Sequence, residues 1–269
     1  MATQTGPGIA VTRDLIYKRE PDYDLPLDIY EPSSYLATVV DLHGGGWFHG
    51  DKAKDEDLAR RLAQSGFRVV VPNYRLTPAY SFPAGVDDVL AAGTWAQSTA
   101  EEGLKKVAFI GSSAGGNLAV EAALATGQPA VSWSGPIDLA GFIAQTDGTG
   151  AAQAPTQDYS RISSAEINQG GRNDGFLRWV ILENVDNDRS RLRDATPINR
   201  AVSTSGPIYM ANSIGEFVPP DGALAMQRAL LNVGVESIMH VIPGTQHAKG
   251  YMDIAFDSSL TFLKRTLDV

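Results

Sequence analysis

Short apolar runs alternate along this chain with longer segments in which apolar residues recur every three or four positions. The short runs are typical of strands buried on both faces, and the longer segments are typical of helices that bury one face. The apolar runs are Ala37–Leu42, Phe67–Val71, Lys106–Ile110, Ala130–Trp133, Pro207–Ala211 and Ser237–Ile242. The predicted helices are Asp55–Gln64, Pro83–Ser98, Ala114–Thr126, Pro220–Asn232 and Met252–Thr266. This alternation predicts an α/β fold with a mostly parallel central sheet and helices on both faces.

The N-terminal region departs from this alternation. Residues 1–10 show no clear pattern, and we expect them to form a loose tail. Val11–Lys18 and Leu25–Tyr30 alternate apolar with polar residues. This pattern predicts two half-exposed strands that form an antiparallel edge of the sheet.

The segment from residue 139 to about residue 200 also interrupts the order of strands and helices. It contains a loop rich in Gly, Ala, Thr and Gln at Gln145–Gln157 and weak helical patterns at Ser164–Gln169 and Gly175–Asn184. The segment is too short and too polar to hold a core of its own. We therefore expect residues 1–269 to form a single domain, in which residues 139–200 are a small cap-like insertion over the sheet.

The first candidate catalytic motif joins a predicted buried strand to the helix that follows it. Its sequence, GSSAGG at residues 111–116, satisfies Gly-x-Ser-x-Gly around Ser113. At a very sharp strand-to-helix turn, the residues two before and two after the serine pass too closely for side chains, and both are glycine here. The turn would expose the Ser113 hydroxyl beside the free N–H groups of the helix. Ser112 is the alternative nucleophile, but Ile110 and Ala114 take the place of its flanking glycines.

A glycine-rich motif, HGGGW at residues 43–47, follows the predicted strand at Ala37–Leu42. Acyl transfer forms an intermediate with a negatively charged oxygen, and each fixed N–H donor stabilises that oxygen by roughly 3–4 kcal/mol. We expect the N–H groups of Gly44, Gly45 and Ala114 to form this oxyanion hole, with Gly46 as an alternative donor. His43 is expected to support the loop through hydrogen bonds. The motif lacks the Gly-Lys-Ser/Thr ending of a nucleotide-binding P-loop.

Together these motifs resemble the hormone-sensitive-lipase-like and feruloyl-esterase-like branches of the α/β-hydrolase superfamily. The stretches NYRLTP at residues 73–78 and FPAGVDD at residues 82–88 also look like these enzymes. The resemblance covers about residues 25–135 and 205–255. It implies an α/β-hydrolase fold and a carboxylesterase-type serine hydrolase that needs no cofactor.

Four histidines are candidates for the base that a serine nucleophile requires. His240 lies inside an apolar strand pattern, where packing is its expected role. His49 lies in the glycine-rich loop and could line the mouth of the pocket. His247 follows a turn just after the last predicted strand, and a loop in this position can reach Ser113. The sequence GTQHA at residues 244–248 also resembles the histidine loop of the family, so we expect His247 to be the base.

The acid of the triad is expected between the serine and the histidine in the chain. The stretch NSIGEFVPPD at residues 212–221 resembles the family's acid loop, in which an acidic residue shortly precedes Val-Pro. Glu216 occupies that place. Asp221 and Asp138 remain alternatives, and Asp138 follows the sixth strand, where some members of the superfamily carry their acid.

Aromatic side chains supply the candidate substrate pocket. We expect Trp47, His49 and Trp133 to contact the substrate. Further aromatic residues that could line an apolar acyl or aryl pocket are Phe48, Phe142, Phe176 and Trp179.

Composition and charge narrow the set of partners. Hydrophobic residues make up 43 % of the chain, but no stretch approaches the roughly 20 apolar residues of a membrane span. The net charge of −9 repels phosphate backbones, so nucleic acid is not an expected partner. With no cysteine and no cluster of other ligands, we expect no metal. The first ten residues lack the features of a secretory signal, which predicts a cytoplasmic protein.

These observations predict hydrolysis of a small-to-medium carboxylic ester through an acyl-enzyme formed on Ser113. Arylformamidase-like amide hydrolysis and acyl transfer are alternatives, because the same triad performs both. A non-catalytic binding protein is a further alternative, and the intact Ser113, His247 and glycine motifs argue against it. The sequence does not predict an oligomeric state.

Overall fold

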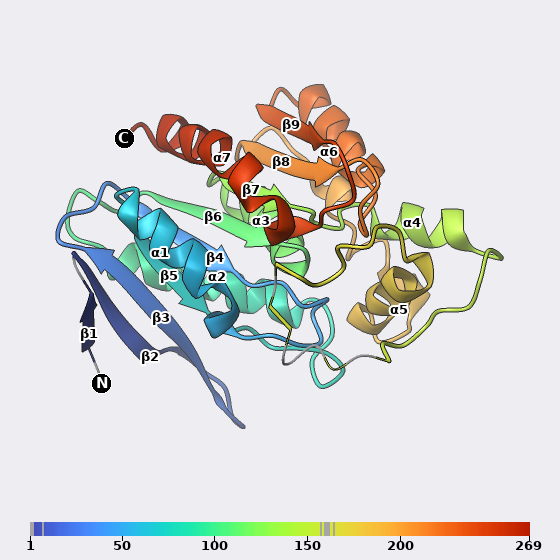
Figure 1. The fold of residues 1–269 in the computed structure, drawn as a ribbon, viewed down its shortest axis with the longest axis horizontal. Helices are drawn as coiled ribbons and strands as arrows, with labels where there is room; N and C mark the ends of the chain where they lie inside the picture. The colour runs from blue at the N-terminus through green and yellow to red at the C-terminus, as the bar shows by residue number, and fades with distance from the viewer. Residues whose placement is uncertain (1–2, 7, 157, 159–161, 164) are drawn as a thin grey trace.

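A twisted sheet between two layers of helices forms the centre of the protein (Figure 1). The structure is a computed structural model that describes residues 3–6, 8–156, 158, 162–163 and 165–269. Within these residues the sheet has nine strands in the order β1-β2-β3-β5-β4-β6-β7-β8-β9. The strands are β1 (Thr3–Gly6), β2 (Ile9–Arg19), β3 (Asp24–Pro32), β4 (Thr38–Leu42), β5 (Arg68–Pro72), β6 (Val107–Ser112), β7 (Ala130–Trp133), β8 (Ile208–Ser213) and β9 (Ser237–Ile242).

The sheet is parallel from β5 to β9 and antiparallel at the edge formed by β1, β2 and β3. The expected strands and the expected antiparallel edge are therefore confirmed. The prediction of a loose tail at residues 1–10 is wrong for the residues that the structure describes, because Thr3–Gly6 pairs with β2; residues 1–2 and 7 lie outside them. This edge strand consists of Thr, Gln and Gly, so it carries no hydrophobic alternation that could reveal it.

Helices cover both faces of the sheet. Side chains of α1 (Glu56–Gln64) and α7 (Met252–Leu267) pack on one face, and those of α2 (Ala84–Ser98), α3 (Ala114–Thr126) and α6 (Asp221–Asn232) pack on the other. Neighbouring strand residues alternate between the two cores, as Val39 and Val40 do in β4. None of the helices in the described part of the chain is long and apolar enough to cross a membrane.

The chain between β7 and β8 carries α4 (Leu139–Thr146) and α5 (Asp174–Asn184), which lie beyond the carboxyl ends of the parallel strands (Figure 1). The predicted helix at Gly175–Asn184 is confirmed as α5. The predicted helix at Ser164–Gln169 is wrong where it can be judged. Ser164 lies outside the described residues, and Ala165–Gly170 forms turns. The helix α4 was missed, although the Asp138 side chain caps its first turn by accepting a hydrogen bond from the N–H of Gly141.

Candidate active site

Ser113 lies at the sharp turn between β6 and α3, with φ of 55° and ψ of −121°. This conformation is rare for a residue with a side chain. The close approach that it requires is visible at the flanking glycines. A Cβ atom on Gly111 would lie 2.2 Å from the carbonyl oxygen of Gly115, and one on Gly115 would lie 1.9 Å from that of Leu42. The turn is further fixed by the Ser113 N–H, which donates to the carbonyl of Trp133 at 2.7 Å.

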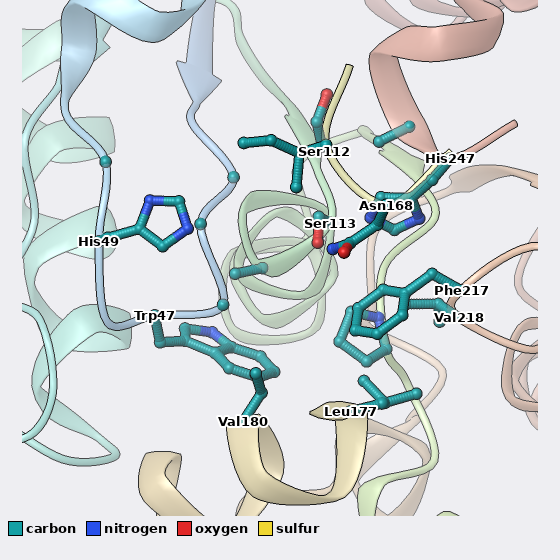
Figure 2. A pocket seen from close by; sticks show the side chains of 18 of the residues that line it. Trp47, His49, Ser112, Ser113, Asn168, Leu177, Val180, Phe217, Val218 and His247 are labelled. Carbon is teal, nitrogen blue, oxygen red and sulfur yellow. The ribbon is translucent and has the colours of Figure 1, made fainter. Parts of the chain in front are cut away.

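Ser112, the alternative nucleophile, is placed differently. Figure 2 shows the Ser112 and Ser113 hydroxyls pointing in opposite directions. The Ser112 hydroxyl is buried, and no described group forms a hydrogen bond with it. Both residues line the cavity, but the Ser113 hydroxyl is the one that points toward the part that His247 lines (Figure 2).

His247 and Glu216 lie against each other behind this cavity. The Nδ1 atom of His247 is 2.6 Å from Oε2 of Glu216, and both side chains are almost completely buried. The other carboxylate oxygen of Glu216 accepts a hydrogen bond from the Ser213 N–H at 2.8 Å, which fixes the carboxylate at the end of β8. The Nε2 atom of His247 is buried and has no hydrogen-bond partner among the described groups. The imidazole is therefore held on one side and unengaged on the side that can serve the cavity.

The alternative acids lie elsewhere. The Asp138 carboxylate caps α4, and Asp221 begins α6. Both line a second cavity, and His247 is not among the residues that line it.

The glycine-rich loop passes directly beside the nucleophile. A Cβ atom on Gly44 would lie 2.9 Å from the carbonyl oxygen of Ser112 and 3.4 Å from the Cβ of Ser113. Gly45 and Gly46 have φ values of 127° and 58°, which other residues rarely adopt. Gly44, Gly45 and Ala114 all line the cavity beside Ser113. Backbone N–H groups in this arrangement can surround an oxygen that is bonded to the carbon under attack.

The remaining histidines have separate surroundings. The ring of His43 stacks on Tyr74 at 4.3 Å, and its Nδ1 lies 2.7 Å from the carbonyl oxygen of Gly44. His49 lines the cavity, and burial lowers its pKa to about 4, so it is neutral at pH 7. His240 lies on β9, where its Nδ1 is 2.8 Å from the hydroxyl of Tyr209.

The cavity in front of Ser113 has mostly apolar walls. Such walls are typical of sites for small organic molecules. Trp47 and His49 line it, as expected. The prediction that Trp133 contacts the substrate is wrong: its side chain is fully buried in the core formed with α7, where the indole N–H donates to Ser259 at 3.0 Å. As a strand residue, Trp133 points to the face of the sheet opposite its neighbours in the chain.

Several cavity residues were not identified from the sequence. Leu177 and Val180 of α5 also line the cavity; Leu177 directly follows Phe176, and Val180 lies about one helical turn after both. The spacing of Val180 from Phe176 and Leu177, four and three residues, was the available signal. Phe217 packs its ring against that of His247 at 5.4 Å between centroids. Asn168 and Lys249 also line the cavity, but nothing in the sequence pattern distinguishes them from surface residues.

Comparison with known proteins places this arrangement in a family. A family model described as alpha/beta hydrolase fold matches residues 39–250. The chain belongs to the alpha/beta hydrolase family.

The relatives of this hydrolase include several esterases. Carboxylesterase NlhH of Mycobacterium tuberculosis is 31 % identical over 244 residues, which are 86 % of this chain and 72 % of the relative. Ethyl acetate hydrolase of Pseudomonas putida is 29 % identical over 246 residues, 87 % of this chain and 74 % of the relative. An arylesterase of Saccharolobus solfataricus is 38 % identical over 122 residues, which span only 43 % of this chain and 40 % of the relative.

Solved structures share the fold at lower identity. The hyperthermophilic esterase of the archaeon Pyrobaculum calidifontis aligns with a TM-score of 0.73 and 22 % identity, over 96 % of this chain and 85 % of that one. Brefeldin A esterase, a bacterial homologue of human hormone sensitive lipase, aligns with a TM-score of 0.72 and 21 % identity, over 97 % and 77 %. The alpha/beta hydrolase fold predicted from the sequence is confirmed, and the chain is a carboxylesterase-type serine hydrolase.

Proposed function

We propose that this hydrolase cleaves small-to-medium carboxylic esters through a Ser113–His247–Glu216 triad and an acyl-enzyme. The observation that carries this proposal is the state of His247, which is bonded to Glu216 through Nδ1 and has its Nε2 unengaged at the cavity of Ser113. A base held in this way can accept a proton from a serine hydroxyl.

In the first half of the reaction, His247 takes the proton of Ser113 as the hydroxyl oxygen attacks the ester carbonyl carbon. The N–H groups of Gly44, Gly45 and Ala114 stabilise the resulting oxyanion. The carbon–oxygen bond to the alcohol then breaks, and the proton on His247 passes to the departing alcohol. The acyl group remains on Ser113.

In the second half, a water molecule attacks the acyl-enzyme while His247 accepts one of its protons. Collapse of the second tetrahedral intermediate returns that proton to Ser113 and releases the carboxylic acid. Throughout both halves the Glu216 carboxylate stabilises the protonated imidazole and holds its ring in place.

We propose further that residues 139–200 act as a cap that shapes the acyl pocket. The support for this role is that Phe176, Leu177 and Val180 of α5 form an apolar wall of the cavity. His49, which lines the cavity from the glycine-rich loop, is neutral near pH 7. These features favour an uncharged apolar acyl chain.

The test is hydrolysis of p-nitrophenyl acetate and p-nitrophenyl butyrate together with labelling by a fluorophosphonate probe. Ser113→Ala should abolish both turnover and labelling. Ser112→Ala is the matched control, and it should keep both because its hydroxyl points away from Ser113. Turnover by Ser113→Ala at the wild-type rate would refute the assignment.

A further inference from the structure

Residues 165–171 of the insertion lie against the loops that carry His247 and Glu216. They are called the segment below. At one end, a Cβ atom on Gly171 would lie 2.9 Å from the carbonyl oxygen of Gly215, the residue before Glu216. At the other, the Thr245 hydroxyl donates to the backbone carbonyl of Gln169 at 3.0 Å. The segment is therefore in direct contact with the backbone on which the acid and the base are carried.

Gln169 makes the closest of these contacts, because its side-chain amide bonds both backbone groups of His247. The His247 N–H donates to Oε1 of Gln169 at 2.9 Å, and Nε2 of Gln169 donates to the His247 carbonyl at 2.9 Å. The same Nε2 also donates to the Ile167 carbonyl at 2.8 Å, which fixes the amide within its own segment. A primary amide is the side-chain group that can donate and accept in this way at once.

The neighbouring Gly250 leaves the space for this amide. A Cβ atom on Gly250 would lie 2.0 Å from Oε1 of Gln169 and 2.6 Å from its Cδ. Gly250 lies in the 3-10 helix Ala248–Tyr251, and its φ is outside the left-handed region. The backbone conformation therefore does not require glycine here, whereas the close approach of Gln169 does.

The histidine loop has a second anchor on the side of the sheet. The N–H of Ala248 donates to the hydroxyl of Ser134 at 2.8 Å, and that hydroxyl is 2.7 Å from the hydroxyl of Tyr251. Gln169 thus holds His247 from the insertion while Ser134 holds the next residue from the carboxyl end of β7. Losing either contact would free one side of the loop.

Asn168 connects the same segment to the substrate space. It adopts a φ of 59° and lines the cavity, and Figure 2 shows its amide directed into the cavity that Ser113 and His247 line. A group bound beside Ser113 can therefore contact Asn168. The next residue, Gln169, is hydrogen-bonded to the backbone of His247.

We propose that Gln169 is a positioning residue for the catalytic base, through which the insertion fixes the backbone of His247 and thereby the direction of its ring. This inference rests on the proposed role of His247. The Nδ1 of His247 must stay in line with Glu216 while its Nε2 serves Ser113, and small displacements of a reacting group are costly. The insertion then completes the catalytic centre in addition to forming a wall of the pocket.

The first test compares Gln169→Met with wild type. Methionine has a similar length but forms none of the three amide hydrogen bonds, so kcat should fall about 10- to 100-fold while KM changes little. The melting temperature should stay close to that of wild type, since Gln169 is only half-buried and lies outside both hydrophobic cores. Glu166→Ala is the matched control, because Glu166 is an exposed residue of the same segment, and it should leave kcat unchanged. An unchanged kcat in Gln169→Met would overturn the proposal.

The second test uses the contact between Gly250 and Gln169. Gly250→Ala should lower kcat in the same direction, because the added methyl group displaces the amide. In the Gln169→Ala background that methyl group has space, so Gly250→Ala should then cause little further loss. If the two effects instead add in full, Gly250 acts independently of Gln169 and the proposal is wrong.

A third measurement separates this proposal from the proposed function. The hydrogen bond between His247 and Glu216 should give a low-field proton NMR resonance in the resting enzyme. We expect this resonance to broaden or shift in Gln169→Met and to persist in Glu166→Ala, whether or not the tested ester is a substrate. If wild type showed no ester turnover that depends on Ser113, the proposed function would be contradicted. An unaltered resonance in Gln169→Met would instead contradict the positioning role.

Discussion

Glu216 shows how one side chain can be assigned a role by its partners. Its carboxylate is completely buried and has the Ser213 N–H on one oxygen and His247 on the other. A buried carboxylate with this pair of donors can hold the imidazole and stabilise its charged form. The alternative acids Asp138 and Asp221 have no such contact among the described residues.

The substitution Glu216→Gln should therefore keep the fold and remove the charge. We expect kcat for p-nitrophenyl butyrate to fall about 10³- to 10⁴-fold, because the neutral amide neither stabilises the imidazolium nor selects the productive tautomer. Asp138→Asn is the control, since asparagine also caps α4. If Asp138→Asn lost activity and Glu216→Gln kept it, the assignment of the acid would be reversed.

A second buried carboxylate, that of Glu121, makes the stability of the fold depend on pH. Burial raises the pKa of Glu121 from 4.5 to about 7, although its ion pair with Arg200 works in the opposite direction. The folded state therefore binds a proton more tightly than the unfolded chain does. The stability that this contributes is present in full below about pH 4.5 and is lost as the pH rises through about 7.

Glu121→Gln tests this dependence because glutamine does not titrate. Between about pH 4.5 and pH 7.5, the free energy of unfolding of the variant should rise relative to wild type by up to about 3 kcal/mol. Urea denaturation at several pH values measures the difference. A difference that stays constant over this range would show that Glu121 is ionised in the folded protein already at low pH.

Among the elements, α5 has the most direct influence on the substrate. Leu177 forms part of the wall between the main cavity and a second one, which Ile181 lines from the next turn of the same helix. The two cavities are separated by the side chains of Pro136, Leu177 and Val218. Truncation of Leu177 would join them.

We therefore expect Leu177→Ala to shift the preference toward longer acyl chains. The ratio of kcat/KM for p-nitrophenyl octanoate to that for p-nitrophenyl acetate should rise, at a cost of about 2–5 kcal/mol in stability. Ile181→Ala removes a side chain of similar volume but enlarges the second cavity alone, so it should leave the ratio near the wild-type value. Equal ratios in both variants would mean that the shared wall does not limit the acyl chain.

The elements that sequence reasoning identified are those with a strong local signal. Strands β4 to β7 are continuous apolar runs, and the turn at Ser113 has its glycines because backbone atoms approach within 2.2 Å of where a side chain would begin. The strand β1 and the helix α4 were missed because their sequences lack a distinctive period. Trp133 was misplaced because an apolar strand gives no signal for which of its residues face the helices on either side.

At the scale of the whole molecule, contacts between distant segments hold the catalytic loop to the first helix layer. Lys249, two residues after His247, is buried and forms ion pairs with Asp55 and Asp57 at the start of α1. Burial and the nearby Asp55 raise the pKa of Asp41 in the same region well above its usual value. Lys249 is thus the cation beside three acidic side chains, those of Asp41, Asp55 and Asp57. Sequence reasoning could not detect this group, because its members lie almost 200 residues apart.

Lys249→Met should destabilise the protein by about 3–5 kcal/mol, because it leaves the buried Asp55 without its partner. Lys105→Met, which removes an exposed ion pair with Glu102, should change stability by no more than about 1 kcal/mol. Urea denaturation compares the two. A loss in Lys249→Met as small as that in Lys105→Met would show that the buried ion pair between Lys249 and Asp55 does not stabilise the fold.

The positions of the tryptophans link their fluorescence to the cavity. Trp47 lines the cavity, and Trp179 stacks on Phe176, another lining residue, at 6.1 Å. Trp133 is sealed in the opposite core. Of the four tryptophans, Trp47 therefore lies where an arriving acyl chain displaces solvent and Trp179 touches a residue that the chain would contact, so the emission of the protein should report occupancy of the cavity before any bond is broken.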